Sequence, residues 1–187
     1  YVNKGAILIN DLERYEEASA TFDQAIRLDP NNASLYYSKG VSLARLRRYE
    51  EALAAYEQAI QLDPNNISAY INKGAMLTDI LNRHEEALTC FERAIQLDPN
   101  DVTLYYNTGL TLTRLTRHED ALVCLEQAIH LDPQNATLYF YKGATLTDLQ
   151  RHEEALAAYE QAIHLDPGDT EAYLEKGKIL AQLGRFE

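Results

Sequence analysis

The sequence predicts an all-α protein built as a linear array of antiparallel helix pairs. The first observation is a repeat of 34 or 35 residues marked by one glycine per unit, at Gly5, Gly40, Gly74, Gly109, Gly143 and Gly177. The second is that all five prolines follow an aspartate and keep the same period, at Pro30, Pro64, Pro99, Pro133 and Pro167. Such a period indicates one small unit copied along a line, so function is sought on an extended surface rather than in one deep pocket.

The repeat of residues 33–66 illustrates the fold expected of each unit. Apolar residues recur at near-helical spacing on both sides of the polar pair Arg47-Arg48, which predicts helices near 33–46 and 49–62. A side chain able to cap the first helix precedes each unit, at Asn32, Asn66, Asp101, Asn135 and Asp169. Each proline ends a second helix because it lacks an N–H group. The repeat glycine inside the first helix costs about 1 kcal/mol relative to alanine, so we expect the second helix to approach closely there.

The repeats divide the chain into a single array. Their predicted bounds are 1–32, 33–66, 67–101, 102–135 and 136–169, followed by a partial or capping unit at 170–187. The first and third repeats carry one extra residue, near Leu12-Glu13 and Leu81-Asn82. A turn can absorb this residue without moving a helix face, so we expect it to be neutral. Because the chain starts at Tyr1, inside a repeat, we expect it to be part of a longer protein.

The repeated residues resemble the tetratricopeptide repeat along the whole chain. The signature aromatic residue four positions before the glycine is always tyrosine, at Tyr1, Tyr36, Tyr70, Tyr105, Tyr139 and Tyr173. The two small residues of the second helix are alanines, at Ala18, Ala52, Ala87, Ala121 and Ala155, and at Ala25, Ala59, Ala94, Ala128 and Ala162. The large residue between them is Phe22, Tyr56, Phe91, Leu125 or Tyr159. The resemblance implies a right-handed superhelical α-solenoid with first helices on the concave face and second helices outside.

The resemblance also implies where a partner would bind, because family members hold partners in the concave groove at fixed offsets from the glycine. The predicted groove residues are Tyr37, Val41, Arg45, Ile71, Asn72, Asp79, Tyr106, Asn107, Leu110, Arg114, Phe140, Tyr141 and Asp148. This surface is mainly apolar and aromatic, its asparagines can bond a peptide backbone, and its charges alternate in sign. Two alternatives remain open: the aromatic residues pack between neighbouring helices, or the charges pair between adjacent repeats.

The leading interpretation is a protein–protein interaction scaffold that holds a peptide or helix of a partner in this groove. Self-assembly through uncapped terminal helices is one alternative, and a targeting arm of a larger enzyme is another. The carboxylate clamp that grips chaperone C-termini is not expected, because it needs an asparagine directly after a repeat glycine. The residues found there are Ala6, Val41, Ala75, Leu110, Ala144 and Lys178.

Composition narrows the range of partners and compartments. The formal net charge of −12 argues against nucleic acid and favours an apolar, aromatic or mildly basic protein ligand. The sequence contains no run of 18 apolar residues, so it predicts no membrane span. No secretory leader is visible, and we therefore expect a cytoplasmic protein. Cys90 and Cys124 occupy equivalent positions in neighbouring repeats and are expected to be free thiols in a reducing compartment.

No pattern in the sequence predicts catalysis, a cofactor or a metal ion. There is no glycine-rich phosphate loop and no nucleophile motif. His84, His118 and His152 open successive second helices. Packed helices place such equivalent positions about 10 Å apart, too far to share a zinc ion, so we interpret the histidines as packing residues. The chain is therefore not expected to be an enzyme.

Overall fold

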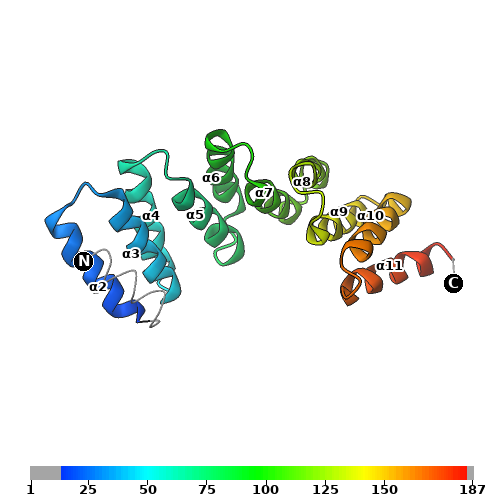
Figure 1. Cartoon of the computed structure of the whole chain (residues 1–187), viewed down its shortest axis with the longest axis horizontal. Coiled ribbons are helices and arrows are strands. Elements are labelled where there is room, and N and C mark those ends of the chain that lie inside the picture. Colours follow the sequence, from blue (N-terminus) through cyan, green and yellow to red (C-terminus); the bar gives the residue numbers. More distant parts are fainter. Residues whose placement is uncertain (1–13, 185–187) are drawn as a thin grey trace. The chain divides into compact units, whose positions relative to one another are not determined.

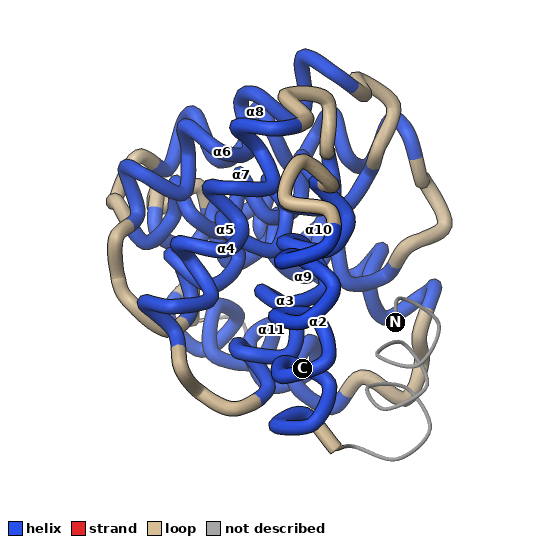
Figure 2. The backbone as a smooth tube through the Cα atoms, turned by 90° about the vertical axis from the view of Figure 1, so that its left-hand side faces the viewer, coloured by secondary structure: helices blue, strands red, loops and turns tan. Residues whose placement is uncertain are grey.

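The computed structural model describes residues 14–184, which form ten α-helices joined by short turns and contain no strand (Figures 1 and 2). The helices are α2 (Tyr15–Leu28), α3 (Ala33–Arg45), α4 (Tyr49–Leu62), α5 (Ile67–Asp79), α6 (His84–Leu97), α7 (Val102–Arg114), α8 (His118–Leu131), α9 (Ala136–Asp148), α10 (His152–Leu165) and α11 (Thr170–Gln182). The helices predicted at 33–46 and 49–62 are confirmed as α3 and α4. The first helix predicted for the first repeat and its turn at Leu12-Glu13 lie outside the described residues.

The chain forms two compact units, Tyr1–Arg83 and His84–Glu187. In the first unit α2, α3, α4 and α5 pack on one another in chain order, and in the second unit α6 to α11 do the same. First helices of the second unit also touch, α7 with α9 and α9 with α11. Within each unit this is the stacking of a solenoid of helix pairs, so the predicted all-α fold class is confirmed.

The repeat glycines allow the two helices of a pair to pack closely, as predicted. A Cβ atom on Gly40 would lie 2.6 Å from the ring of Tyr56, and a Cβ atom on Gly143 would lie 2.8 Å from the ring of Tyr159. Carbon atoms in ordinary contact are about 3.5–4.0 Å apart, so only glycine leaves room for these rings. Both tyrosines are almost fully buried. The cost of glycine in a helix is offset by the aromatic ring that the missing side chain admits.

A residue with left-handed backbone lies in the turn that follows each first helix of the described residues. The φ angles are 60° at Arg47, 53° at Asn82, 58° at Thr116, 59° at Gln150 and 68° at Gly184. After Arg47, Thr116 and Gln150, the N–H of the next residue donates to a carbonyl of the last helical turn, as Arg48 N donates to the Leu43 oxygen at 2.9 Å. This is the bonding of a Schellman motif, which satisfies carbonyls at the helix end.

The predicted helix caps form at three of the five positions. The side chains of Asn66, Asp101 and Asp169 accept N–H bonds from the first turn of their helices. Asn32 and Asn135 do not, and for these two the prediction is wrong. Their amides instead donate to Asp29 and Asp132, which precede the prolines, at 3.0 and 3.2 Å. The bond to the aspartate uses the side-chain N–H group, and the side-chain oxygen accepts no bond from the helix, so the residue type alone does not decide the cap.

Candidate functional site

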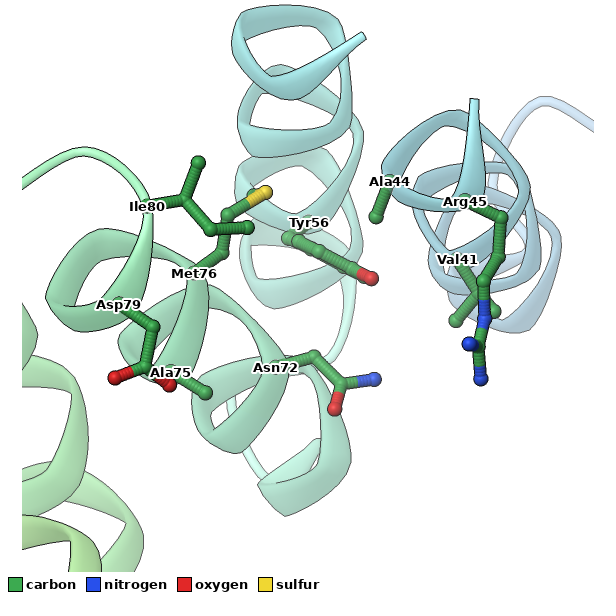
Figure 3. Close-up of a pocket in the computed structure, with 9 residues that line it drawn as sticks. All are labelled: Val41, Ala44, Arg45, Tyr56, Asn72, Ala75, Met76, Asp79 and Ile80. Atoms are coloured by element: carbon green, nitrogen blue, oxygen red, sulfur yellow. The ribbon is translucent and has the colours of Figure 1, made fainter. Parts of the chain in front are cut away.

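A hollow of about 270 Å³ opens between α3, α4 and α5 in the first unit (Figure 3). Its lining residues are Val41, Ala44 and Arg45 on α3, Tyr56 on α4, Asn72, Ala75, Met76 and Asp79 on α5, and Ile80 directly after α5. The two first helices of neighbouring repeats thus form its sides, and a second helix closes it from behind. Sequence reasoning predicted four of these nine residues as groove residues: Val41, Arg45, Asn72 and Asp79.

The hollow combines an apolar interior with charges of opposite sign at its rim. Val41, Ala44 and Ala75 are half-buried, and Met76 is buried. Arg45 and Asp79 are exposed and come from opposite sides, α3 and α5 (Figure 3). Apolar surface left open to water between fixed charges is suited to binding an apolar group while selecting its charged neighbours.

Tyr56 forms the back of the hollow, and its phenol points toward the side of Asn72 (Figure 3). Burial raises the pKa of this phenol well above its ordinary value; Tyr37 raises it further, and the interaction with Asn72 opposes the rise. The hydroxyl therefore stays protonated and keeps its O–H as a donor.

Asn72 links Tyr56, at the back of the hollow, to a second aromatic residue, Tyr37. Its Nδ2 donates to the hydroxyl of Tyr37 at 3.1 Å, and the rings of Tyr37 and Tyr56 have centroids 6.0 Å apart. The bond fixes the amide of Asn72 in place. The same side chain interacts with the Tyr56 hydroxyl, so the carbonyl oxygen is the group of this amide that can accept a further bond.

The other predicted aromatic groove residues lie in the second unit, where they form a chain of ring contacts. Tyr106 and Phe140 each lie 5.4 Å from Tyr141, measured between ring centroids, and Phe140 lies 5.7 Å from Tyr159. Tyr106, Phe140 and Tyr141 are half-buried, as are Ile71, Asn107 and Leu110. Packing between rings therefore accounts for part of each aromatic surface, and the remainder is open to solvent.

The four predicted charged residues, Arg45, Asp79, Arg114 and Asp148, are all exposed. Asp148 at the end of α9 lies 3.6 Å from Nδ1 of His118 at the start of α8. This contact between adjacent repeats is attractive only when the imidazole is protonated.

A second hollow, of about 200 Å³, lies in the second unit where α7 and α9 begin. It is lined by Val102, Thr103, Tyr106, Asn135, Thr137 and Leu138. Tyr106 is the predicted groove residue among them. The predicted residues Asn107, Leu110, Arg114, Phe140, Tyr141 and Asp148 line neither of these two hollows.

Five lining residues of the first hollow were missed from the sequence, and two of them had a signal. Ile80 is the first residue of the longer turn in the third repeat, which we expected to be neutral. In the structure 44% of its surface is exposed, and it lines the hollow. Tyr56 was assigned only to the outer helix, although its ring reaches between α3 and α5. Ala75 follows Gly74 directly, as Val41 follows Gly40, so its offset was a signal as well, whereas Ala44 and Met76 carried no distinguishing pattern.

The two cysteines, Cys90 and Cys124, are not joined in a disulfide, as predicted. Burial, assisted by the charge of Asp120 and opposed by Arg117, raises the pKa of Cys124 to about 11. Within residues 14–184 no three His, Cys, Asp or Glu side chains gather where they could hold a metal ion. No helix in this part of the chain is long and apolar enough to span a membrane.

The chain matches known repeat proteins in sequence and in structure. Four family models described as tetratricopeptide repeat or TPR repeat match residues 11–67, 43–108, 81–142 and 143–184. No curated protein sequence matches the chain at a significant level.

Solved structures give the same result. A MamA fragment from Desulfovibrio magneticus RS-1 is 24% identical with a TM-score of 0.84, over 91% of this chain and 95% of that one. YrrB, described as a TPR protein with an unusual peptide-binding site, is 26% identical with a TM-score of 0.83, over 95% and 90%. The first TPR of Spaghetti (RPAP3), bound to an HSP90 peptide, is 27% identical with a TM-score of 0.61, over 65% and 96%.

Proposed function

Because this chain belongs to the tetratricopeptide repeat family, we propose that it is a protein-interaction scaffold whose hollow between α3, α4 and α5 receives one apolar side chain of a partner peptide. The observation that carries the proposal is the open apolar hollow with Arg45 and Asp79 at its rim. YrrB has a peptide-binding site, and the RPAP3 repeat holds a peptide, which supports the same kind of partner here.

The size of the hollow favours a side chain over a free small molecule. Its volume of about 270 Å³ lies below the roughly 300–1,000 Å³ typical of small-molecule sites. An aliphatic or aromatic side chain would contact Val41 and Ala75, which are half-buried, and remove their exposed apolar surface from water.

The polar groups around the hollow define the neighbours of that side chain. The carbonyl oxygen of Asn72 suits a backbone N–H group of a peptide. Arg45 and Asp79 favour an acidic residue on one side of the apolar anchor and a basic residue on the other. A chaperone C-terminal tail is not the occupant we propose, because Val41 and Ala75 follow the glycines where the carboxylate clamp needs asparagine.

The proposal is tested with a random peptide library displayed on phage and selected on the immobilised protein. Enriched peptides are expected to share one large apolar residue flanked by charges. Val41→Asp places a carboxylate beside the hollow and should weaken these peptides by about ten-fold or more, since an apolar group would have to bury it. Val123→Asp is the matched control, because Val123 lies on α8 and is 67% exposed.

Two results would contradict this function. One is equal binding by the parent and the Val41→Asp variant, which would remove the hollow from the site. The other is equal weakening by Val41→Asp and Val123→Asp, which would indicate a general effect of added negative charge.

A further inference from the structure

The hydroxyl of Tyr56 is a hydrogen-bond donor at the back of the hollow between α3, α4 and α5. Tyr56 is 2% exposed, and it is one of the residues that line the hollow. Its phenol oxygen points to the side of the hollow where Ala44 and Asn72 lie (Figure 3). Burial raises the pKa of the phenol, so the hydroxyl keeps the proton that it can donate.

The residues around this hydroxyl leave its proton without an acceptor. The Asn72 side chain lowers the pKa of Tyr56, which is the effect of an amide N–H group donated to the phenol oxygen. Nδ2 of the same amide donates to the hydroxyl of Tyr37 at 3.1 Å. Among the residues that the structure describes, none accepts a hydrogen bond from the Tyr56 hydroxyl. A donor in this position is costly to cover unless the group that covers it brings an acceptor.

The equivalent tyrosine of α10 shows what is missing beside Tyr56. Tyr159 interacts with Thr147, which stands four residues after Gly143. Four residues after Gly40 stands Ala44, which has no hydroxyl group. Ala44 also lines the hollow, so the same small side chain leaves an open space and a donor without a partner next to it.

We propose that the residue of the partner peptide that enters this hollow is a tyrosine. The inference rests on the proposed function of the hollow and names the side chain that it binds. The ring would lie against Val41 and Ala75, and its oxygen would accept the O–H of Tyr56. One lone pair of the Asn72 carbonyl oxygen would accept the O–H of the bound tyrosine, and the second would remain for a backbone N–H group. Both hydroxyl groups then have partners once water has left the hollow.

Other side chains match the hollow less completely. A leucine or a phenylalanine fills the apolar space, but it covers the Tyr56 hydroxyl without offering an acceptor. A glutamate offers acceptors together with a charge, which is costly to bury beside Val41 and Met76. A glutamine adds two N–H donors to its acceptor. Tyrosine combines a large apolar surface with one neutral hydroxyl at its tip.

The test uses pairs of synthetic peptides that differ only in tyrosine or phenylalanine at the anchor position. Their sequences come from the phage selection on this protein, and a peptide selected with another anchor is made with both residues. Binding to the whole 187-residue chain is followed by fluorescence anisotropy. The tyrosine peptide should bind about 3- to 10-fold more tightly, which corresponds to one buried hydrogen bond. Equal affinity, or tighter binding of the phenylalanine peptide, would overturn the proposal.

The variant Tyr56→Phe identifies the donor. It keeps the buried ring, and Phe22 and Phe91 occupy the equivalent position in other repeats, so this variant is expected to fold. The preference for the tyrosine peptide should disappear, because the donor is gone. Tyr159→Phe is the matched control, since Tyr159 does not line this hollow, and it should keep the preference. A preference that survives Tyr56→Phe, or that Tyr159→Phe also removes, would overturn the proposal.

A second variant gives Tyr56 a partner within the protein. Ala44→Thr supplies the hydroxyl that Thr147 supplies in α9. The ratio of the two peptide affinities should fall, even if both peptides bind more weakly because the threonine occupies part of the hollow. A ratio equal to that of the parent would contradict the assignment of the open donor to Tyr56.

The outcomes separate this inference from the proposed function. If Val41→Asp weakens the peptides but the tyrosine and phenylalanine peptides bind equally, the hollow is a binding site and the tyrosine anchor is wrong. If Val41→Asp has no effect on any peptide, the hollow is not the binding site and both proposals fail.

Discussion

Replacing Gly143 by alanine should destabilise this protein, while the same replacement at Gly177 should stabilise it. Both residues lie inside first helices and occupy equivalent positions in their repeats. Alanine gains about 1 kcal/mol over glycine in a helix interior, and this gain applies to both sites. The two variants therefore differ in what the added methyl group meets.

At Gly143 the methyl group would lie 2.8, 2.9 and 2.9 Å from the Cε1, Cδ1 and Cζ atoms of Tyr159. Ordinary contacts are about 3.5–4.0 Å, so the ring would have to move by roughly 0.6–1.2 Å. Tyr159 is 1% exposed and surrounded by core residues, so it has no free space to enter. Overpacking of this kind costs about 1–3 kcal/mol, which cancels or exceeds the helical gain.

At Gly177 no described atom lies within 4 Å of the methyl group, so only the helical gain remains. It should amount to at most about 1 kcal/mol, and less if α11 opens before the rest of the array. The two variants should thus differ in unfolding free energy by about 1–3 kcal/mol, with Gly143→Ala the less stable.

Guanidinium unfolding followed by circular dichroism measures this difference, with the slope compared between variants so that a change in cooperativity is recognised. Gly143→Ala should lose its steric cost when Tyr159 is also changed to alanine, which a double-mutant cycle detects. The reasoning is refuted if Gly143→Ala stabilises the protein as much as Gly177→Ala does. It is also refuted if the cost at Gly143 is the same with and without the tyrosine ring.

Three further predictions follow from single side chains. Asn66→Ala should destabilise the protein by about 1 kcal/mol in a denaturant titration because it removes a cap bond, whereas Asn32→Ala should cost less, since Asn32 makes no cap bond. Cys124 should react with iodoacetamide at pH 8 about 10- to 100-fold more slowly in the folded than in the unfolded chain, as peptide mapping can measure, because its pKa is raised to about 11; equal rates would contradict the burial argument. The bond with Arg48 lowers the pKa of Glu51, so the stabilisation from this pair is present above the ordinary pKa of glutamate and lost as the pH falls through the lowered value. Arg48→Ala should return the pKa of Glu51 toward its ordinary value in an NMR titration. An unchanged pKa would exclude Arg48 as the cause.

The sequence predicted the helices and the packing at the glycines because both depend on short-range patterns. The apolar period, the Asp-Pro ends and the polar turns determined α3 and α4 to within one residue. The glycine of each first helix precedes the large residue of its second helix by 16 residues, or by 17 in the two repeats with the longer turn, so the same close contact is expected in each pair. Gly40 with Tyr56 and Gly143 with Tyr159 follow that rule.

The hollow was predicted only in part because its shape depends on contacts between repeats. Val41 and Asn72 could be placed from their offset to the glycine. Tyr56 could not, because its ring belongs to the helix expected on the outside and reaches between two first helices. Ile80, directly after α5, also lines the hollow, and the direction in which a turn residue points is not contained in its spacing.

The caps show the same limit at single residues. Asn32 and Asn66 are the same amino acid at equivalent positions, yet only Asn66 caps its helix, whereas the amide of Asn32 donates to Asp29.

The sequence by itself determined the repeat, the helix pairs, the family and the close packing of the two helices at the repeat glycine, since each follows from residues close together in the chain. The tertiary structure decided which residues of different helices come together on one surface, as they do in the hollow of the first unit. The physical reason is that a helix carries the same residues whether or not a neighbour covers it. Whether Tyr37 is half-buried while Leu174 is exposed depends on helices that lie beside them in space.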